Sequence, residues 1–267
     1  MDIEKSKVPF GVFEIPGGFL KAIQGEDEDA EPVIKRFCVV TLKEMTGHEE
    51  DILSNDKLTV TERLHKVLGR CITEIATEDG SECITDKDTL LTLPNKLLMS
   101  DIVVLLIRLR QVTVEDLYRF QIRCPGCTVA QMKGINLSTL EVHPVKGDVL
   151  SRVRTFMLRD EREAVWEMMT GRHEKEQASK KIKKDARSRA TQALMVRVKT
   201  IDNEPVTPVM LKDLSQKERE ALRREFDQEG GIETSFDVTC NACGIEFVSE
   251  LEIGGGNFFS HSEPEQT

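Results

Sequence analysis

Two copies of a Cys-x-x-Cys motif constrain the fold of this chain more than any other feature of its sequence. The first is CPGC at residues 124–127, and the second is CNAC at residues 240–243. The tight turn of such a motif aims both sulfurs at one point, so two copies can supply the four thiolates of a tetrahedral zinc site. A closed shell of four ligands leaves no position for a substrate, and its role is therefore structural. The predicted ligands of one structural Zn²⁺ ion are Cys124, Cys127, Cys240 and Cys243.

The distance between the two motifs is long for a zinc site. Cys124 and Cys240 are 116 residues apart, whereas the two halves of a compact zinc ribbon are usually about 15–20 residues apart. Two unrelated thiol pairs or two redox motifs are therefore alternatives, and a four-thiolate site also suits iron. Each motif follows an alternating, strand-like stretch, at residues 118–123 and 236–239, and this similarity favours one shared site.

Length, charge and apolar patterning narrow the classes of protein to which the chain can belong. It has 267 residues and a net charge of −10. This negative charge argues against a nucleic-acid-binding site that covers the whole surface. The opening MDIEKSKVPF lacks the apolar segment of a signal peptide, and the apolar run at residues 102–107 is too short to span a bilayer. We therefore expect a protein of a reducing cytosol, without membrane contact, whose paired cysteines bind metal rather than form disulfides.

Superimposing the chain on itself with a shift near 116 residues, the distance between the two Cys-x-x-Cys motifs, reveals further matches. Residues 36–44 fall on 152–160, residues 71–80 fall near 195–204, and Ser100 corresponds to Ser215. Identity is low, but the order of strand, helix, strand, helix, strand and Cys turn repeats. This order predicts an α+β fold of two pseudo-repeated α+β halves, joined by a shared zinc-ribbon-like site of four cysteines. A single irregular α+β domain without duplication is the alternative.

Flanking segments lie on either side of the predicted halves. The Pro-Gly-Gly sequence at residues 16–18 predicts a turn in an N-terminal hairpin, and an acidic loop follows at residues 25–32. Near the other end, Phe258 and Phe259 follow three glycines and either fold back on the protein or insert into a partner. The predicted parts are an N-terminal hairpin with the acidic loop (1–33), a first α+β half with the first Cys turn (34–145), a second α+β half with a basic helix and the second Cys turn (146–253), and a flexible tail (254–267).

Local signals predict where several helices begin and end. Capping boxes, in which a Ser or Thr and a Glu three residues later exchange hydrogen bonds, occur at Thr46–Glu49, Thr59–Glu62 and Ser215–Glu218. Gly69 and the Gly230–Gly231 pair are predicted helix stops. We also expect a helix in the most basic stretch, residues 172–189. Its eight Lys and Arg against three Asp and Glu suit either a solvated helix face or contact with an acidic partner protein.

No catalytic motif stands out in the sequence. The five histidines are scattered, and His173–Gln177 has a Gln where a zinc-protease helix needs its second His. There is no Gly-x-Ser-x-Gly motif and no P-loop. We therefore predict that the protein is not an enzyme.

Several stretches resemble the T-even-type baseplate and tail-assembly proteins of contractile-tailed bacteriophages. They are EIPGG at residues 14–18, VVTLKEMTGHEEDIL at 39–53, DIVVLLIRLR at 101–110 and CPGC at 124–127. The resemblance covers most of residues 10–145 and continues more weakly to residue 253. It implies a non-enzymatic structural or assembly protein, either a scaffold or a chaperone, of a phage tail baseplate or hub. The implied partners are other phage tail proteins, and the oligomeric state would be set by assembly. The implied location is the host cytoplasm during assembly and the baseplate of the finished tail.

A zinc-ribbon regulator that binds nucleic acid is the alternative function. It requires a basic, aromatic face beside the Cys turns. Arg119, Arg123 and Lys133 lie near the first turn, but Glu246 and Glu250 lie near the second. This mixture of charges makes nucleic acid the less favoured partner.

Overall fold

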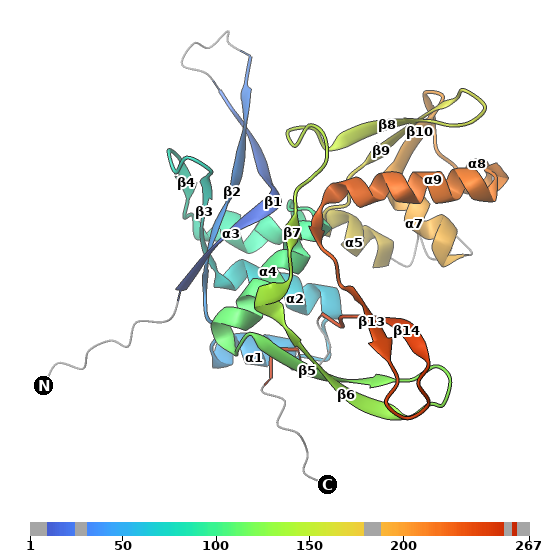
Figure 1. Ribbon diagram of the computed structural model, residues 1–267. Helices are drawn as coiled ribbons and strands as arrows, with labels where there is room; N and C mark the ends of the chain where they lie inside the picture. Colours follow the sequence, from blue (N-terminus) through green and yellow to red (C-terminus); the bar gives the residue numbers. More distant parts are fainter. Residues whose placement is uncertain (1–9, 25–30, 179–187, 254–257, 261–267) are drawn as a thin grey trace, which may run out of the picture.

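The computed structural model describes residues 10–24, 31–178, 188–253 and 258–260. Within these residues, helices accompany antiparallel sheets, which confirms the predicted α+β class (Figure 1). Two of the sheets have four strands each, and three further sheets are two-stranded. None of the described helices is long and apolar enough to cross a membrane.

The first four-stranded sheet has the order β1-β2-β3-β4, with each neighbouring pair antiparallel. Its strands are β1 (Phe10–Ile23), β2 (Val33–Lys43), β3 (Ile72–Thr77) and β4 (Cys83–Ile84). The helical segments of this region are α1 (Gly47–Leu53), α2 (Val60–Cys71), α3 (Lys87–Thr92), η1 (Leu93–Asn95) and α4 (Met99–Thr113). Val40 and Ile75 of the sheet share one fully buried core with Leu68 of α2 and Leu105 of α4.

Helix α4 is apolar around most of its circumference and is covered on more than one side. Leu105 and Leu109 lie in the core of the first sheet, whereas Ile107 lies in a separate core. A helix with apolar residues all round must be covered in this way to be stable in water. Two charged residues of α4, Asp101 and Arg110, are also fully buried, and each holds a segment that is distant in sequence.

The Pro-Gly-Gly sequence is a bulge within one long strand, so the predicted turn is wrong. Strand β1 runs through it, and its register with β2 shifts between Glu14 and Phe19. The Asp101 carboxylate accepts a hydrogen bond of 2.7 Å from the Gly17 N–H. A Cβ atom on Gly17 would lie 2.5 Å from Leu98 and 2.7 Å from Asp101, and Gly18 has φ +71°. The glycines therefore allow the start of α4 to approach the strand.

The second four-stranded sheet has the order β11-β10-β9-β8 and is also antiparallel. Its strands are β8 (Val153–Met157), β9 (Glu163–Glu167), β10 (Val198–Ile201) and β11 (Glu204–Pro205). The helical segments of this region are α5 (Gly171–Ala178), α7 (Arg189–Arg197), α8 (Pro208–Asp213), α9 (Gln216–Phe226) and η3 (Asp227–Glu229). Trp166 is fully buried, and its ring centroid lies 5.0 Å from that of Phe226. Residues 179–187 of the predicted basic helix lie outside the described residues.

The two regions are joined directly by backbone contacts. Met99 N–H donates to the Met169 carbonyl at 2.8 Å, and Gly171 N–H donates to the Leu97 carbonyl at 3.1 Å. A Cβ atom on Gly171 would overlap the Pro94 carbonyl oxygen, so only glycine fits there. Strands β7 (Val142–His143) and β12 (Gly231–Ile232) form a further small sheet, and η2 (Leu137–Thr139) precedes β7.

The three predicted capping boxes are present, but one predicted helix stop is wrong. The glutamates accept hydrogen bonds from the N–H groups of Thr46, Thr59 and Ser215 at 3.0, 2.8 and 2.9 Å. Gly69 lies inside α2, where a Cβ atom would come within 2.7 Å of the Leu91 carbonyl oxygen. This glycine therefore serves close packing between helices rather than termination.

Candidate metal centre

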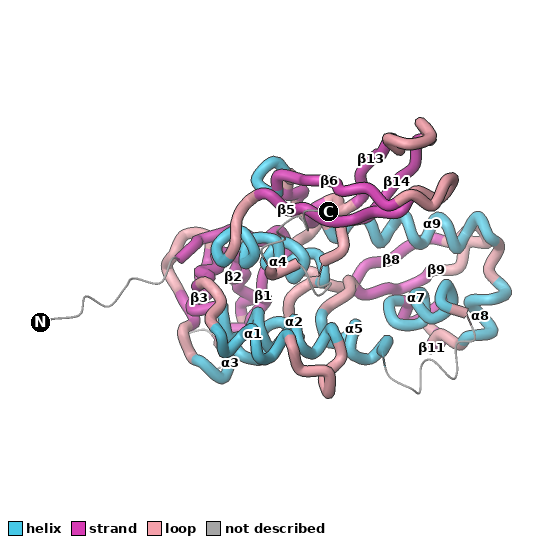
Figure 2. The backbone as a smooth tube through the Cα atoms, turned by 90° about the horizontal axis from the view of Figure 1, so that it is seen from below, coloured by secondary structure: helices cyan, strands magenta, loops and turns pink. Residues whose placement is uncertain are grey.

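Each Cys-x-x-Cys motif forms the turn of a two-stranded hairpin. The first hairpin consists of β5 (Leu117–Arg123) and β6 (Ala130–Asn136), and the second of β13 (Ser235–Thr239) and β14 (Glu246–Glu250). Strands are therefore present before both motifs, as the alternating residues predict. Figures 1 and 2 both show the two hairpins side by side.

The two Cys turns have the same backbone hydrogen bonds. In the first, Cys124 N–H donates to the Val129 carbonyl and Thr128 N–H donates to the Cys124 carbonyl, both at 3.0 Å. In the second turn, the corresponding bonds run from Cys240 N–H to Ile245 at 2.9 Å and from Gly244 N–H to Cys240 at 3.0 Å.

The residue that follows each motif has a left-handed backbone, with φ 62° at Thr128 and 72° at Gly244. In both turns, the sulfur of the first cysteine also accepts a backbone N–H, from Gly126 or Ala242, at 3.4 Å. The two turns therefore present their sulfurs in the same way.

The four predicted sulfur ligands meet between the two hairpins. The Sγ atoms of Cys124 and Cys243 are 3.7 Å apart, those of Cys127 and Cys240 are 3.6 Å apart, and all four lie within 4.8 Å of one another. A tetrahedral shell with metal–sulfur distances of about 2.3 Å has sulfur–sulfur edges of about 3.8 Å. The sulfur atoms therefore already have nearly the spacing that a tetrahedral metal requires. Cys124 and Cys240 are buried, Cys127 is half-buried and Cys243 is exposed.

The electrostatics of the four thiols also suit a cation. The pKa of Cys240 is lowered to about 6, because the N–H groups of Cys243 and Ala242 donate to its sulfur. A hydrogen bond from the Val129 N–H lowers the pKa of Cys127, but burial and the other three sulfurs raise it to about 12. Four thiolates this close repel one another, and a divalent cation would offset that repulsion. The residues present therefore fit a structural zinc ion.

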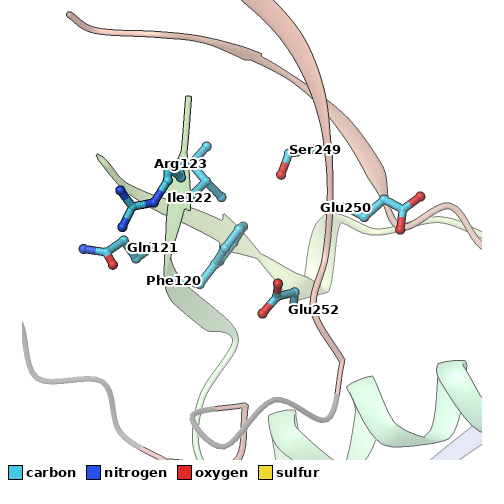
Figure 3. A pocket seen from close by; sticks show the side chains of 7 residues that line it. All are labelled: Phe120, Gln121, Ile122, Arg123, Ser249, Glu250 and Glu252. Atoms are coloured by element: carbon cyan, nitrogen blue, oxygen red, sulfur yellow. The ribbon is translucent and has the colours of Figure 1, made fainter. Parts of the chain in front are cut away.

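Aromatic side chains and one side-chain hydrogen bond also connect the two hairpins. The rings of Phe120 and Phe236 meet edge to face with centroids 5.7 Å apart. The Asn241 N–H donates to the Gln131 side chain at 3.0 Å. Between the hairpins is a hollow of about 280 Å³ (Figure 3). It is lined by Phe120, Gln121, Ile122, Arg123, Ser249, Glu250 and Glu252.

The segment at residues 258–260 folds back on the protein, which decides between the two alternatives for its phenylalanines. Phe258 is fully buried and meets the Tyr118 ring edge to face, with centroids 5.1 Å apart. The buried Arg110 guanidinium donates to the carbonyl oxygens of Phe258 and Ser260. It also lies 4.8 Å from the Tyr118 ring centroid. An arginine within the apolar run of α4 was the sequence signal for this contact, because a buried guanidinium needs several acceptors.

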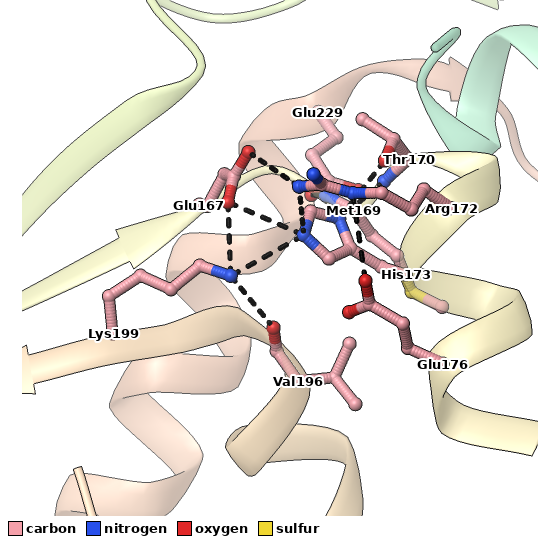
Figure 4. A network of polar contacts seen from close by, with 9 residues as sticks. All are labelled: Glu167, Met169, Thr170, Arg172, His173, Glu176, Val196, Lys199 and Glu229. Atoms are coloured by element: carbon pink, nitrogen blue, oxygen red, sulfur yellow. Dashed lines mark hydrogen bonds and ion pairs between the residues drawn. The ribbon is translucent and has the colours of Figure 1, made fainter. Parts of the chain in front are cut away.

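A polar network around the buried His173 at the start of α5 was missed by sequence reasoning (Figure 4). Thr170 N–H donates to His173 Nδ1 at 3.1 Å, and His173 Nε2 lies 3.3 Å from Glu167. Since Nδ1 accepts, the proton of the neutral ring is on Nε2 and points to Glu167. The hydrogen bond from His173, followed by that from Lys199, lowers the pKa of Glu167 to about 2. The sequence signal was Met-Thr-Gly, which occurs at residues 45–47 and again at 169–171.

Comparison with known proteins places the chain in a family. No curated protein and no solved structure matches it in these comparisons. A family model described as T4 bacteriophage base plate protein matches residues 32–259, which is most of the chain and includes all four cysteines of the cluster. The match agrees with the resemblance carried by the sequence motifs, and the chain belongs to the T4 bacteriophage base plate protein family.

Proposed function

We propose that this protein is a non-enzymatic scaffold of the phage tail baseplate, with one structural zinc ion bound by Cys124, Cys127, Cys240 and Cys243. The single observation that carries the zinc proposal is the set of four sulfurs within 4.8 Å, spaced as a tetrahedral shell requires. Membership of the baseplate family supports the structural role and other tail proteins as partners. Either a permanent place in the baseplate or a transient role as a chaperone in the host cytoplasm satisfies this proposal.

The metal would act by fixing the two hairpins against each other. A two-stranded hairpin is at best marginally stable alone, so each one depends on what covers it. Ring packing between Phe120 and Phe236 and the Asn241–Gln131 hydrogen bond contribute, but both are modest contacts. A structural zinc ion contributes free energy of folding directly, because the unfolded chain lacks the preformed site. The hairpins would then form one rigid surface for a neighbouring tail subunit.

We also propose that the chain consists of two pseudo-repeated α+β halves, at residues 34–145 and 146–253, with β1 added to the first sheet. The two sheets support this, because each is a four-stranded antiparallel meander. In each region a helical segment lies between the second and third strands, and others lie between the fourth strand and the Cys-x-x-Cys hairpin. The repeated Met-Thr-Gly sequence, which ends at Gly47 and at Gly171, supports it further.

The proposed repeat has a different offset from the one that the Cys motifs suggest. Residues 36–43 lie in β2, the second strand of its sheet, whereas residues 153–157 form β8, the first strand of the other. Their predicted pairing is therefore displaced by one strand. By strand order, β1 corresponds to β8 and β2 to β9, so the repeated unit includes β1 in addition to residues 34–145, and the offset from Gly47 to Gly171 is 124 residues rather than 116.

Metal analysis and phage assembly test the proposed function separately. Elemental analysis of the purified protein should give one zinc ion per chain, and replacement of any one of the four cysteines by Ser should release it. Cys83→Ser is the control, because Cys83 is an exposed free cysteine outside the four-sulfur cluster. Protein without bound metal would refute the zinc site.

A phage that carries a stop codon in this gene should produce no complete baseplates by electron microscopy, and normal baseplates would refute the tail role. Mass spectrometry of purified virions distinguishes a permanent subunit, which is detected, from a chaperone, which is not.

A further inference from the structure

The two hairpins present outer faces that point away from each other. Side chains of a strand alternate between its two faces. The inner faces meet through Phe120 and Phe236, so residues one position away in the strands point outward. Figure 3 shows the Arg123 and Glu250 side chains directed away from each other on the two sides of the hollow.

The outer face of the first hairpin is basic around an apolar centre. Met132 is 51% exposed and lies opposite Gln121 in the strand pair. Arg119 and Arg123 are exposed on the same face of β5. Residues 117–136 contain three Lys and Arg and no Asp or Glu. We call Arg119, Gln121, Arg123 and Met132 the basic face.

The outer face of the second hairpin also has an apolar centre but carries the opposite charge, and its flanking charges lie on the second strand of the hairpin rather than the first. Val248 is 66% exposed and lies opposite Asp237. Glu246 and Glu250 are exposed on either side of Val248 in β14. Residues 233–252 contain five Asp and Glu and no Lys or Arg. We call Asp237, Glu246, Val248 and Glu250 the acidic face.

These two faces occupy equivalent positions in equivalent hairpins. Met132 is eight residues after the first cysteine of its motif, and Val248 is eight residues after the first cysteine of the other. Each face therefore has an exposed apolar side chain at the same point, and the charges around that point are opposite. Because the faces point in opposite directions, the basic face of one chain cannot cover its own acidic face.

We propose that the basic face of one copy of this protein binds the acidic face of a second copy. Met132 meets Val248 at the centre of the contact, and the arginines pair with the carboxylates around it. Opposite potentials steer such an encounter and exclude the like-charged pairing of two identical faces. The contact is heterologous, so successive copies form a ring if the rotation closes and a filament if it does not.

This inference rests on the proposed function, since the zinc ion holds the two hairpins in their relative orientation. Each face is a few residues wide on two short strands, which is smaller than the roughly 800 Å² per partner of a standard stable interface. We therefore expect a weak, salt-sensitive contact in free solution. In an assembled baseplate, simultaneous contacts along a closed ring would strengthen it by raising the effective concentration.

Sedimentation velocity of the full chain, over a range of protein and salt concentrations, tests the contact. The wild-type protein should self-associate, and raising NaCl from about 50 mM to about 500 mM should weaken association at least about tenfold, because salt screens exposed charges. Arg119→Gln/Arg123→Gln, and separately Asp237→Asn/Glu246→Gln/Glu250→Gln, should each weaken self-association by at least about tenfold. Mixing these two variants should give a two-chain species and nothing larger, since each variant retains only one intact face.

The matched control is Arg223→Gln/Arg224→Gln on the exposed side of α9, which removes the same charge and should leave association unchanged. A wild-type protein that contains one zinc per chain but stays monomeric at low salt overturns this inference and leaves the proposed function intact. Association that both face variants leave unchanged also overturns it.

Discussion

The segments Met45–Gly47 and Met169–Gly171 have the same sequence but different surroundings. Each leads into a helix, α1 or α5, and each threonine N–H is capped by the residue three positions later. That residue is Glu49, which pairs with Arg70, in the first region. It is His173, which pairs with Glu167, in the second. The cap needs only an acceptor, and either a carboxylate or a neutral imidazole provides it.

The glycines show a larger difference. A Cβ atom on Gly47 would meet nothing within 4 Å, whereas one on Gly171 would overlap the Pro94 carbonyl oxygen. The glycine of this sequence therefore lies on a free surface in one region and forms the joint between the regions in the other. Local sequence fixes the start of a helix, but the surroundings decide how much of the stability depends on it.

Removal of zinc should reduce the stability of the protein most, and the loss should differ most between the two regions. We expect Cys240→Ser to lower the free energy of unfolding by at least about 3 kcal/mol, because a structural zinc ion contributes to folding directly. Hydrogen exchange should increase most in residues 235–250 and least in the first sheet, whose core contains no cluster cysteine. Equal loosening of both regions would contradict this ranking.

Alanine at the two equivalent glycines should have the next largest effect. Gly171→Ala should destabilise the protein by at least about 2 kcal/mol, because the new methyl group overlaps backbone that cannot rotate away. Gly47→Ala should leave the stability unchanged or raise it by up to about 1 kcal/mol, because alanine favours the helix. Urea denaturation of both variants measures the difference, and similar free energies of unfolding for the two would show that the two glycines are equally constrained.

Lowering the pH should have the smallest effect on stability, and it should destabilise both regions. Burial raises the pKa of Glu49, but hydrogen bonds from Arg70 and Thr46 outweigh it and lower the pKa to about 2. The pKa of Glu167 is also about 2. For a carboxyl with a depressed pKa, the stabilisation is complete above the ordinary pKa of 4.5 and is lost as the pH falls towards 2.

The matched variants are Glu49→Gln and Glu167→Gln. Each should reduce stability at neutral pH by about 1–2 kcal/mol and flatten the decline of stability below pH ~4.5. Denaturant titrations at a series of pH values measure both. An unchanged pH profile in either variant would show that its carboxylate does not carry this dependence.

Features set by short-range chemistry could be predicted from the sequence. The Cys-x-x-Cys turns, the strands before them and the three capping boxes depend on residues within a few positions of one another. It was also predictable that the two cysteine pairs, 116 residues apart in the sequence, form one cluster, because half of a metal site has no function alone.

Features set by distant neighbours were predicted wrongly or missed. The Pro-Gly-Gly bulge depends on Asp101, and Gly69 depends on the Leu91 carbonyl, neither of which a local pattern contains. Helix stops and turns were assigned to these glycines because those are their commonest local uses. The polar network of His173 was missed because its partner Glu167 lies on a strand, so helix periodicity could not reveal it.

The contact between Arg110 and the Phe258 carbonyl sets an order of events during synthesis. The two residues are separated by 148 positions, so a nascent chain exposes α4 long before its guanidinium finds those acceptors. The second pair of cysteines also emerges from the ribosome late. Until residues 240–260 are synthesised, Arg110 lacks its Phe258 acceptor and the first cysteine pair lacks the other two sulfurs, so the two hairpins can pack together only after that segment has left the ribosome.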